Sequence, residues 1–449
     1  MTHKQSSSQS ARLYERALKV MPGGCSRNTV LRKPHPLYAM HGEGCYLTDI
    51  EGVRRIDFAN NMASLIHGHA LPAIVDAVSK QLQMGTGYTM ATEVEVLFAE
   101  HLCSRAPSFD KIRFVNSGTE AVMSAVKASR AFTGRAKIAK IEGAYHGQYD
   151  YAEVSQNAGP ANWGEVDRPS SVPVVHGTPP SALADVIVIP FNDTDRAIAI
   201  LERNAADLAC VLIDLMPHRI GLIPAQTDYV RKLREWTADN DVLLVCDEVI
   251  TLRCHYGGAQ ATYDIEPDLT AMGKMIGGGF PVGALAGSDA VMSVMDPLAD
   301  KVLFPHAGTF SANPVTMTAG RIAMELFDAP AIDRLNELGE QARAAITQAI
   351  EAADVPACVT GAASMFRIHM KPIPPVNYRE AYDLAGEAAL RESFLDYALA
   401  NGIFLVGTCT GMLSTAMTAK EIDRLAEVVE GAFRSIKPAL QAAENNRKV

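Results

Sequence analysis

The sequence predicts an α/β protein whose core is a mostly parallel β-sheet flanked by helices. Strand-like and helix-like segments alternate between residues 112 and 272, which is typical of a doubly wound sheet. The strand-like segments are apolar at successive positions, as expected for strands that are buried on both faces. The clearest of them, residues 242–245, ends just before Asp247 and Glu248. Acidic residues at the carboxyl end of such a strand lie where open α/β sheets bind ligands.

The start of the chain predicts a helix followed by a hairpin. Residues 11–21 have apolar side chains at helical spacing, and a Pro-Gly-Gly turn follows them. Residues 46–57 are typical of a hairpin that turns at Gly52. Amphipathic helices are predicted next, over residues 73–83 and 93–103.

A strand over residues 112–115 leads through a short turn into a helix over residues 121–130. The turn contains Ser117, Gly118 and Thr119. Free N–H groups at a helix N-terminus, next to a glycine, favour the binding of a phosphate dianion. The alternative is a plain helix N-cap, in which Ser117 or Thr119 bonds only its own helix.

The remaining strands and helices of the sheet follow in alternation. Strands are predicted at residues 137–141, 186–190, 208–215 and 269–272, and helices at 194–204 and 227–239. Tyr145 lies just past the first of these strands, where its ring could stack on a flat heteroaromatic ring. A packed loop tyrosine is the alternative. Residues 157–181 are predicted to be a long loop that covers the site or contributes to an interface.

The end of the chain predicts a separate, smaller α+β unit. A helix is predicted from Met317. The smaller unit begins at about residue 326 and combines a long amphipathic helix over residues 332–350 and a last helix over 422–433 with short strands at 366–369 and 403–406. We expect residues 61–325 to form the large domain. Residues 1–60 and 326–449 are expected to form the smaller domain together.

The composition excludes several classes of protein. The net charge of the 449 residues is −10 (41 − 51), which argues against a nucleic-acid partner and against an anionic membrane surface. No segment approaches the ~20 apolar residues of a membrane span, and the polar N-terminus lacks the apolar core of a secretion signal. The eight cysteines form no Cys-x-x-Cys pair, so we expect reduced thiols, no metal site and a cytoplasmic location.

Two residues point to a particular chemistry. Lys274 lies 27 residues (274 − 247) after Asp247 and is followed by three glycines at 277–279. A lysine amine can form a Schiff base with an aldehyde cofactor. A carboxylate can keep a pyridine nitrogen protonated, which lets the ring withdraw electrons. The pair therefore suits pyridoxal 5'-phosphate (PLP). A strand-end acid and a surface lysine beside a glycine turn are the alternative.

Five motifs in order give the chain a resemblance to a known family. They are NSGTEA at 116–121, YHG at 145–147, DEV at 247–249, GK followed by GGG at 273–279, and AGTFSANP at 307–314. The chain resembles class III PLP-dependent aminotransferases over roughly residues 13–433. Within that family it is similar to the glutamate-1-semialdehyde 2,1-aminomutases and the β-amino-acid (β-phenylalanine type) aminotransferases. The resemblance implies fold type I, the aspartate-aminotransferase-like fold, with a seven-stranded sheet.

The resemblance also implies roles for residues at matching positions. Lys274 would carry the Schiff base and shuttle the proton, and Asp247 would pair with the ring nitrogen. Thr309 would reach the phosphate bound to the neighbouring subunit, which implies a homodimer with active sites at its interface. The cofactor contacts implied in all are Ser117, Gly118, Thr119, Tyr145, His146, Asp247, Val249, Lys274 and Thr309.

Substrate recognition is where the chain departs from the family. The resemblance implies Glu-Pro before DEV, but Asp214-Leu215 stands there. Residues 407–415 lack the arginine that many relatives use for a carboxylate. Arg27 matches the carboxylate-binding arginine of the β-amino-acid branch, and a solvated loop charge is its alternative reading. Arg219 and Arg253 are less well aligned candidates.

We therefore expect amino transfer between a β-amino acid or related amine and a 2-oxo acid or aldehyde, through Lys274 and pyridoxamine phosphate. The alternatives are a glutamate-1-semialdehyde 2,1-aminomutase, an amino acid racemase and a non-catalytic PLP-binding protein.

Overall fold

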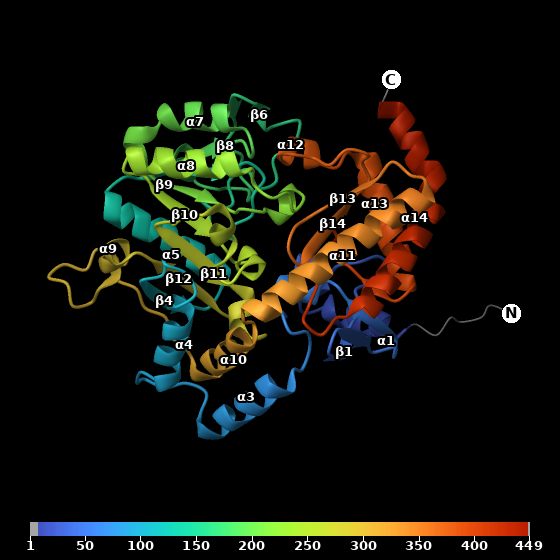
Figure 1. Ribbon diagram of the computed structural model, residues 1–449, viewed down its shortest axis with the longest axis horizontal. Helices are drawn as coiled ribbons and strands as arrows, with labels where there is room; N and C mark the ends of the chain where they lie inside the picture. The colour runs from blue at the N-terminus through green and yellow to red at the C-terminus, as the bar shows by residue number, and fades with distance from the viewer. Residues whose placement is uncertain (1–7, 448–449) are drawn as a thin grey trace.

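A seven-stranded sheet forms the centre of the computed structural model, which describes residues 8–447 (Figure 1). The strand order is β4-β12-β11-β10-β9-β5-β8. The pairs from β11 to β8 are parallel, and β12 is antiparallel to both of its neighbours. The mostly parallel sheet predicted from the sequence is confirmed. The strands are β4 (Lys111–Val115), β5 (Lys137–Ile141), β8 (Val186–Ile189), β9 (Leu208–Ile213), β10 (Leu243–Asp247), β11 (Leu269–Gly273) and β12 (Gly283–Gly287).

Strand β12 is the member of this sheet that the sequence did not predict. Four of its five residues, GALAG, are glycine or alanine, and none has a β-branched or aromatic side chain, so they give a weak strand signal. The close neighbours explain this composition. A Cβ atom added to Gly283 would lie 2.0 Å from the carbonyl oxygen of Ser117, which leaves no room for a side chain.

Helices cover both faces of the sheet, as expected for strands without a polar side. Helix α5 (Gly118–Thr133) covers one face, and α7 (Thr194–Glu202) and α8 (Thr227–Asp239) cover the other. Successive residues of β10 point to opposite faces. Val245 accordingly packs in the cluster under α5, and Leu244 packs in the cluster under α8.

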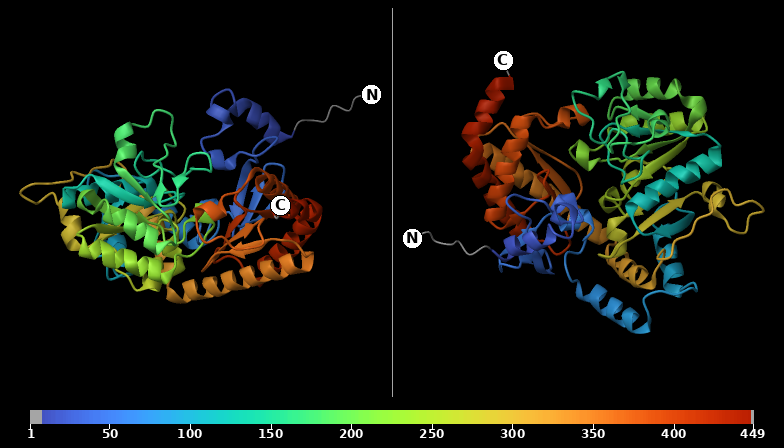
Figure 2. Two further views of the ribbon diagram at one scale, coloured as in Figure 1. Left: turned by 90° about the horizontal axis from the view of Figure 1, so that it is seen from above. Right: turned by 180° about the vertical axis from the view of Figure 1, so that it is seen from behind.

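The two ends of the chain combine in a second unit beside the large sheet (Figures 1 and 2). A four-stranded sheet joins β1 (Ala39–Glu43), β2 (Tyr46–Asp49) and β3 (Arg54–Asp57) to β15 (Ile403–Phe404). Strand β15 runs parallel to β3. It ends at Phe404, so it is shorter than the strand predicted at 403–406. A three-stranded sheet and the last long helices complete the unit. These are β13 (Cys358–Thr360), β14 (Met365–His369), β16 (Thr410–Met412), α11 (Ala329–Ala353), α13 (Ala385–Ala400) and α14 (Ala419–Arg447).

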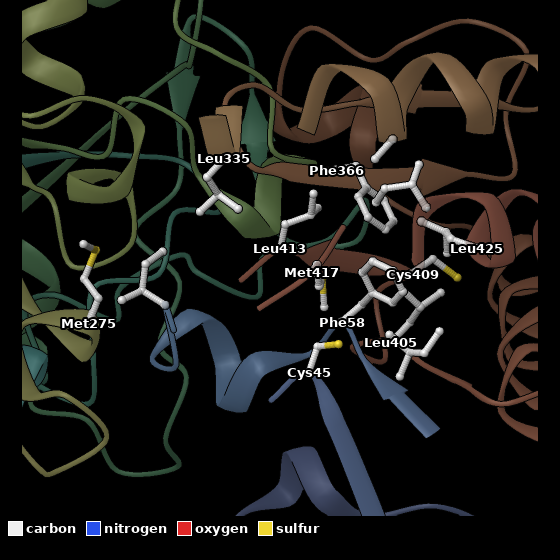
Figure 3. Close-up of a cluster of buried hydrophobic side chains, with 14 of the residues drawn as sticks. Cys45, Phe58, Met275, Leu335, Phe366, Leu405, Cys409, Leu413, Met417 and Leu425 are labelled. Atoms are coloured by element: carbon white, nitrogen blue, oxygen red, sulfur yellow. The ribbon is translucent and has the colours of Figure 1, made fainter. Parts of the chain in front are cut away.

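One hydrophobic cluster holds this unit together and reaches the large sheet (Figure 3). Phe58 from the N-terminal segment packs edge-on against Phe366 of β14, with ring centroids 5.9 Å apart. Met275, which belongs to the same cluster, directly follows Lys274 in the chain. The cluster therefore crosses the expected domain boundaries at 60/61 and 325/326, which stay a prediction.

Most predicted helices are present, with shifted ends. The helix at 93–103 is α4 (Glu93–Cys103), whereas the first helix is α1 (Gln9–Ala17) rather than residues 11–21. The predicted loop at 157–181 contains a small hairpin of β6 (Gly164–Glu165) and β7 (Arg168–Pro169). Between residues 8 and 447, no helix has both the length and the apolar content needed to cross a bilayer. Two further helices, α3 (Pro72–Met84) and α10 (Pro314–Leu326), pack against each other.

Candidate active site

The carboxyl ends of three neighbouring parallel strands share one cavity of about 170 Å³. Asp214 follows β9, Asp247 ends β10, and Lys274 follows β11. A cavity of about 150 Å³ accommodates one six-membered aromatic ring, so this space suits a small aromatic molecule. Its walls are formed by Ser117, Gly118, Thr119, Tyr145, His146, Gly147, Asp214, His218, Asp247, Val249, Ile250 and Lys274.

Asp247 is held rigidly at the floor of this cavity. His146 donates its Nδ1–H to Oδ2 of Asp247 at 2.8 Å, and the backbone N–H of Val249 donates to Oδ1 at 3.0 Å. Both side chains are buried. Burial lowers the pKa of His146, and the hydrogen bond that its ring donates to Asp247 opposes this shift. The other ring nitrogen of His146, Nε2, is buried without a hydrogen-bond partner among residues 8–447.

Lys274 adopts a strained backbone conformation. Its φ of +49° lies in the left-handed region, which is unfavourable for a residue with a Cβ atom and is often found at functional sites. Burial lowers the pKa of the Lys274 amine, while the charges of Asp247 and Asp214 raise it. Burial thus raises the fraction of the Lys274 amine that is unprotonated at neutral pH.

The N-terminus of α5 forms a glycine-lined cradle at one end of the cavity. Ser117 is the N-cap, and its Oγ accepts a hydrogen bond from the N–H of Glu120 at 3.1 Å. A Cβ atom on Gly118 would lie 3.0 Å from both Cγ atoms of Val249. Because Gly118 has no side chain, its backbone borders the cavity directly, where N–H groups can meet an anion.

Tyr145 stands at the wall of the cavity and contacts His218 and Arg219. The ring of His218 meets it edge-on at 5.7 Å, and the guanidinium of Arg219 lies 5.2 Å from its centroid. The loop that carries Tyr145 is fastened by Lys140, which is fully buried. The Nζ of Lys140 donates to the carbonyl oxygens of residues 141, 144 and 154, at 3.2, 3.1 and 2.7 Å. Burial lowers the pKa of Lys140 to about 7.

Most of the residues that the sequence singled out therefore meet in one place, whereas Thr309, Arg27, Arg219 and Arg253 do not line this cavity. Thr309 is exposed and does not line the cavity. Arg27 lines a second, larger cavity of about 1150 Å³, where its Nη1 donates to Oδ1 of Asn61 at 2.8 Å. Arg253 is fully buried against Ser364 and the carbonyl of Leu413. It does not line the cavity, and its suggested anion contact stays a prediction.

Four wall residues were not predicted as site residues: Gly147, Ile250 and the titratable Asp214 and His218. Asp214 had a signal, because it follows a buried strand as Asp247 does. Burial, and then the charge of Asp247, raise the pKa of Asp214 well above its usual value. His218 had no such signal, since it lies in a loop whose path depends on packing. Burial, and then the charge of Lys274, lower the pKa of His218 to about 3, so this imidazole is neutral at physiological pH.

Comparison with known proteins agrees with this arrangement. The family model described as aminotransferase class-III matches residues 29–432. The chain belongs to the class III aminotransferases. The glutamate-1-semialdehyde 2,1-aminomutase of Methanothermobacter thermautotrophicus is 36% identical over 433 residues, covering 96% of this chain and 100% of the relative.

Solved structures extend the similarity to the fold. The structure of an omega-transaminase from Sphaerobacter thermophilus is similar with a TM-score of 0.94 and 46% identity, covering 96% of this chain and 98% of the other. The β-phenylalanine aminotransferase from Variovorax paradoxus is similar with a TM-score of 0.85 and 33% identity, covering 95% and 94%. The seven-stranded sheet of this class III enzyme is thus the sheet of fold type I.

The cofactor of this enzyme family is PLP, and the residues of the cavity fit it. The cradle at Gly118 offers backbone N–H groups to a phosphate, and Tyr145 and Val249 line the cavity for a flat ring. Asp247 presents a carboxylate at the strand edge, and Lys274 presents an amine in the same cavity. The protein is a PLP-dependent enzyme.

Proposed function

We propose that this enzyme moves an amino group between a β-amino acid or related amine and a 2-oxo acid or aldehyde. The observation that carries the proposal is the meeting of Lys274, Asp247 and the Gly118 cradle in one buried cavity. The amino donor and the carbonyl acceptor are both small molecules, which bind in turn.

Lys274 is the proposed catalytic base. When bound, PLP supplies the electron sink that stabilises a substrate carbanion. Lys274 would hold the cofactor covalently through Nζ and, once the substrate has displaced it, take the proton from the amine-bearing carbon. Because burial lowers the pKa of Lys274, more of the amine is free to accept that proton near neutral pH. The same Nζ would then deliver the proton to the carbon of the cofactor that receives the amino group.

The other cavity residues have proposed binding roles. Asp247, oriented by His146 and by the N–H of Val249, would face the ring nitrogen. Tyr145 and Val249 would cover the two faces of the ring. Ser117, Gly118 and Thr119 would hold the phosphate at the N-terminus of α5.

A second copy of the chain is part of the proposal. Thr309 lies on the exposed segment before α10, and we place it against the phosphate bound to a partner subunit. Phe310 beside it is 68% exposed, which suits a segment that a partner covers. The working unit would be a homodimer in the cytoplasm. Its small domain would comprise residues 1–60 and 326–449, around a large domain of residues 61–325.

Intermolecular transfer is preferred over the intramolecular aminomutase reaction. The aminomutase alternative is supported by the name of the relative that is 36% identical. Transfer is supported by the 46% identity to the omega-transaminase. Arg27 further supports a carboxylated amine as donor, because a guanidinium matches carboxylate geometry. Arg27 lines the larger cavity together with Gly279, which lies five residues (279 − 274) after Lys274.

A donor-only reaction tests the proposal. The holoenzyme, given β-phenylalanine without any acceptor, should release one keto product per active site, whereas a mutase retains its intermediate. Borohydride should link the cofactor to Lys274 in the resting enzyme. Lys274→Ala should lose this link and slow the reaction by a factor of about 10³ or more, while Lys127→Ala, on the outer part of α5, should change neither. Conversion at the wild-type rate by Lys274→Ala would refute the assignment.

A further inference from the structure

A left-handed turn of four residues borders the larger cavity. Residues Asn60–Ala63 have φ values of 45°, 45°, 58° and 69°. Asparagine tolerates this conformation, but methionine and alanine rarely adopt it. Backbone strain of this kind persists only where the surrounding structure imposes it, and it gathers at functional sites.

Hydrogen bonds from several parts of the chain impose the conformation. Oδ1 of Asp57 accepts the N–H groups of Ala59 and Asn60, at 2.9 and 3.0 Å. The buried side chain of Asn60 donates to the carbonyl oxygen of Met412 at 2.6 Å. Met412 lies in the stretch 407–415, where an arginine is missing. The turn thus connects the N-terminal segment to the C-terminal stretch that would otherwise recognise a carboxylate.

The turn presents one side chain to Arg27. Oδ1 of Asn61 accepts a hydrogen bond from Nη1 of Arg27 at 2.8 Å. Ser64 determines which end of the Asn61 amide faces the arginine. The hydroxyl of Ser64 donates to the backbone carbonyl of Asn61, and its oxygen accepts from Nδ2 of Asn61, both at 2.9 Å. With its NH₂ group used in this way, the amide can offer only its oxygen to Arg27.

The partner of Arg27 differs from the partners of other arginines at the same cavity. Three other arginines along its wall each pair with a carboxylate: Arg32 with Asp396, Arg55 with Asp49, and Arg391 with Asp383. Arg27 is held by a neutral amide instead. An amide orients a guanidinium without neutralising its charge, so the remaining N–H groups of Arg27 stay available for an anion.

We infer that Asn61 is a positioning residue for substrate recognition: it holds Arg27 oriented and charged to bind the carboxylate of the amino donor. The inference rests on the proposed function, because that function gives Arg27 its substrate. Met62 and Leu65, on and beside the turn, line the same cavity, as does Gly279, which lies five residues (279 − 274) after Lys274. The donor carboxylate would thus bind in the cavity that Gly279 and the turn line together.

Binding of 3-phenylpropionate to the cofactor-free protein tests the inference by calorimetry. Asn61→Asp should neutralise Arg27 and weaken binding by about tenfold or more, close to the loss for Arg27→Ala. Asn61→Gly retains a residue suited to positive φ but loses the amide, and should weaken binding by about three- to fivefold. The matched control, Asn28→Asp, adds the same charge beside Arg27 at an exposed position and should change the Kd less than twofold.

Kinetics of the holoenzyme give a second readout. Asn61→Asp should raise KM for the β-amino acid about tenfold and leave kcat/KM for a simple arylalkylamine, which has no carboxylate, unchanged. Equal effects of Asn61→Asp and Asn28→Asp, or binding by Arg27→Ala as tight as wild type, would overturn the inference. Failure of the proposed function would appear separately, as absence of amino transfer from either donor.

Discussion

Nδ1 of His146 lies 2.8 Å from Oδ2 of Asp247, and the two side chains are 0% and 6% exposed. His146 comes from the loop after β5, and Asp247 ends β10, so the contact joins segments that are 101 residues apart. Together with the N–H of Val249 on Oδ1, it fixes the plane of the carboxylate. The proposed contact of Asp247 with the cofactor nitrogen therefore depends on a residue that itself need not touch the ring.

Replacing His146 should loosen the cofactor. His146→Leu leaves Oδ2 of Asp247 without its charge-assisted hydrogen bond, which is worth about 1.5–3 kcal/mol. The Kd for PLP should therefore rise about 10- to 100-fold, as measured by titrating the cofactor-free protein and following its visible absorption. His146→Asn keeps an N–H donor and should recover most of the affinity. Unchanged PLP binding by His146→Leu would contradict the proposed role.

Lys140 should make stability depend on pH. Its pKa in the folded protein is about 7, below the 10.4 of an unfolded lysine. Between these values the unfolded chain binds more protons, so the free energy of unfolding rises as pH increases. Lys140→Met lacks this titration.

The thermal midpoint of the wild type minus that of Lys140→Met should thus increase from pH 7 to pH 9.5. The half-buried Lys137 of the same strand, which pairs with Asp207, provides the control when it is replaced by methionine. Parallel pH profiles for wild type and Lys140→Met would show that Lys140 does not titrate in this window.

Asp214 should produce the opposite slope. Its folded pKa is raised by burial and by Asp247, so the folded state holds its proton above the unfolded pKa. The wild type then loses stability as pH rises from about 4 through the folded pKa. Asp214→Asn removes the titration, and its stability relative to the wild type should increase between pH 5 and pH 8. Chemical unfolding of the cofactor-free proteins measures this, and a constant difference across the range would contradict it.

Gly118 and Val249 should be coupled energetically. A Cβ atom at Gly118 would contact both Cγ atoms of Val249 at 3.0 Å, closer than ordinary carbon contacts. Gly118→Ala alone should weaken PLP binding about tenfold, because Val249 must move into the cavity. The double variant with Val249→Ala should regain part of the affinity, since the methyl groups in conflict are gone. A strictly additive double variant would argue that the two residues do not compete for this space.

The sequence predicted the centre of the site because its signals are local. A buried strand that ends on Asp247 and a second that ends before Lys274 are both visible as short patterns. Parallel strands place their carboxyl ends at one edge of a sheet, so the two residues had to lie at the same edge. The structure confirms β10 and β11 as neighbours.

The residues that were not predicted depend on contacts between distant segments. Asn61 meets Arg27 only because a left-handed turn faces the N-terminal segment. His218 meets Tyr145 only because a loop after β9 folds over the end of β5. Strand β12 was missed because its two glycines reflect crowding, by Ser117 at Gly283 and by Asp268 at Gly287, rather than strand propensity.

The amino-acid sequence alone determined the alternation of strands and helices and the placement of an amine and an acid at strand ends. It also indicated PLP as the cofactor. These results follow from patterns within short stretches of the chain. Only the tertiary structure decided which neutral, buried or strained side chains orient those groups. Their roles depend on distances and burial that arise when segments far apart along the chain are packed together.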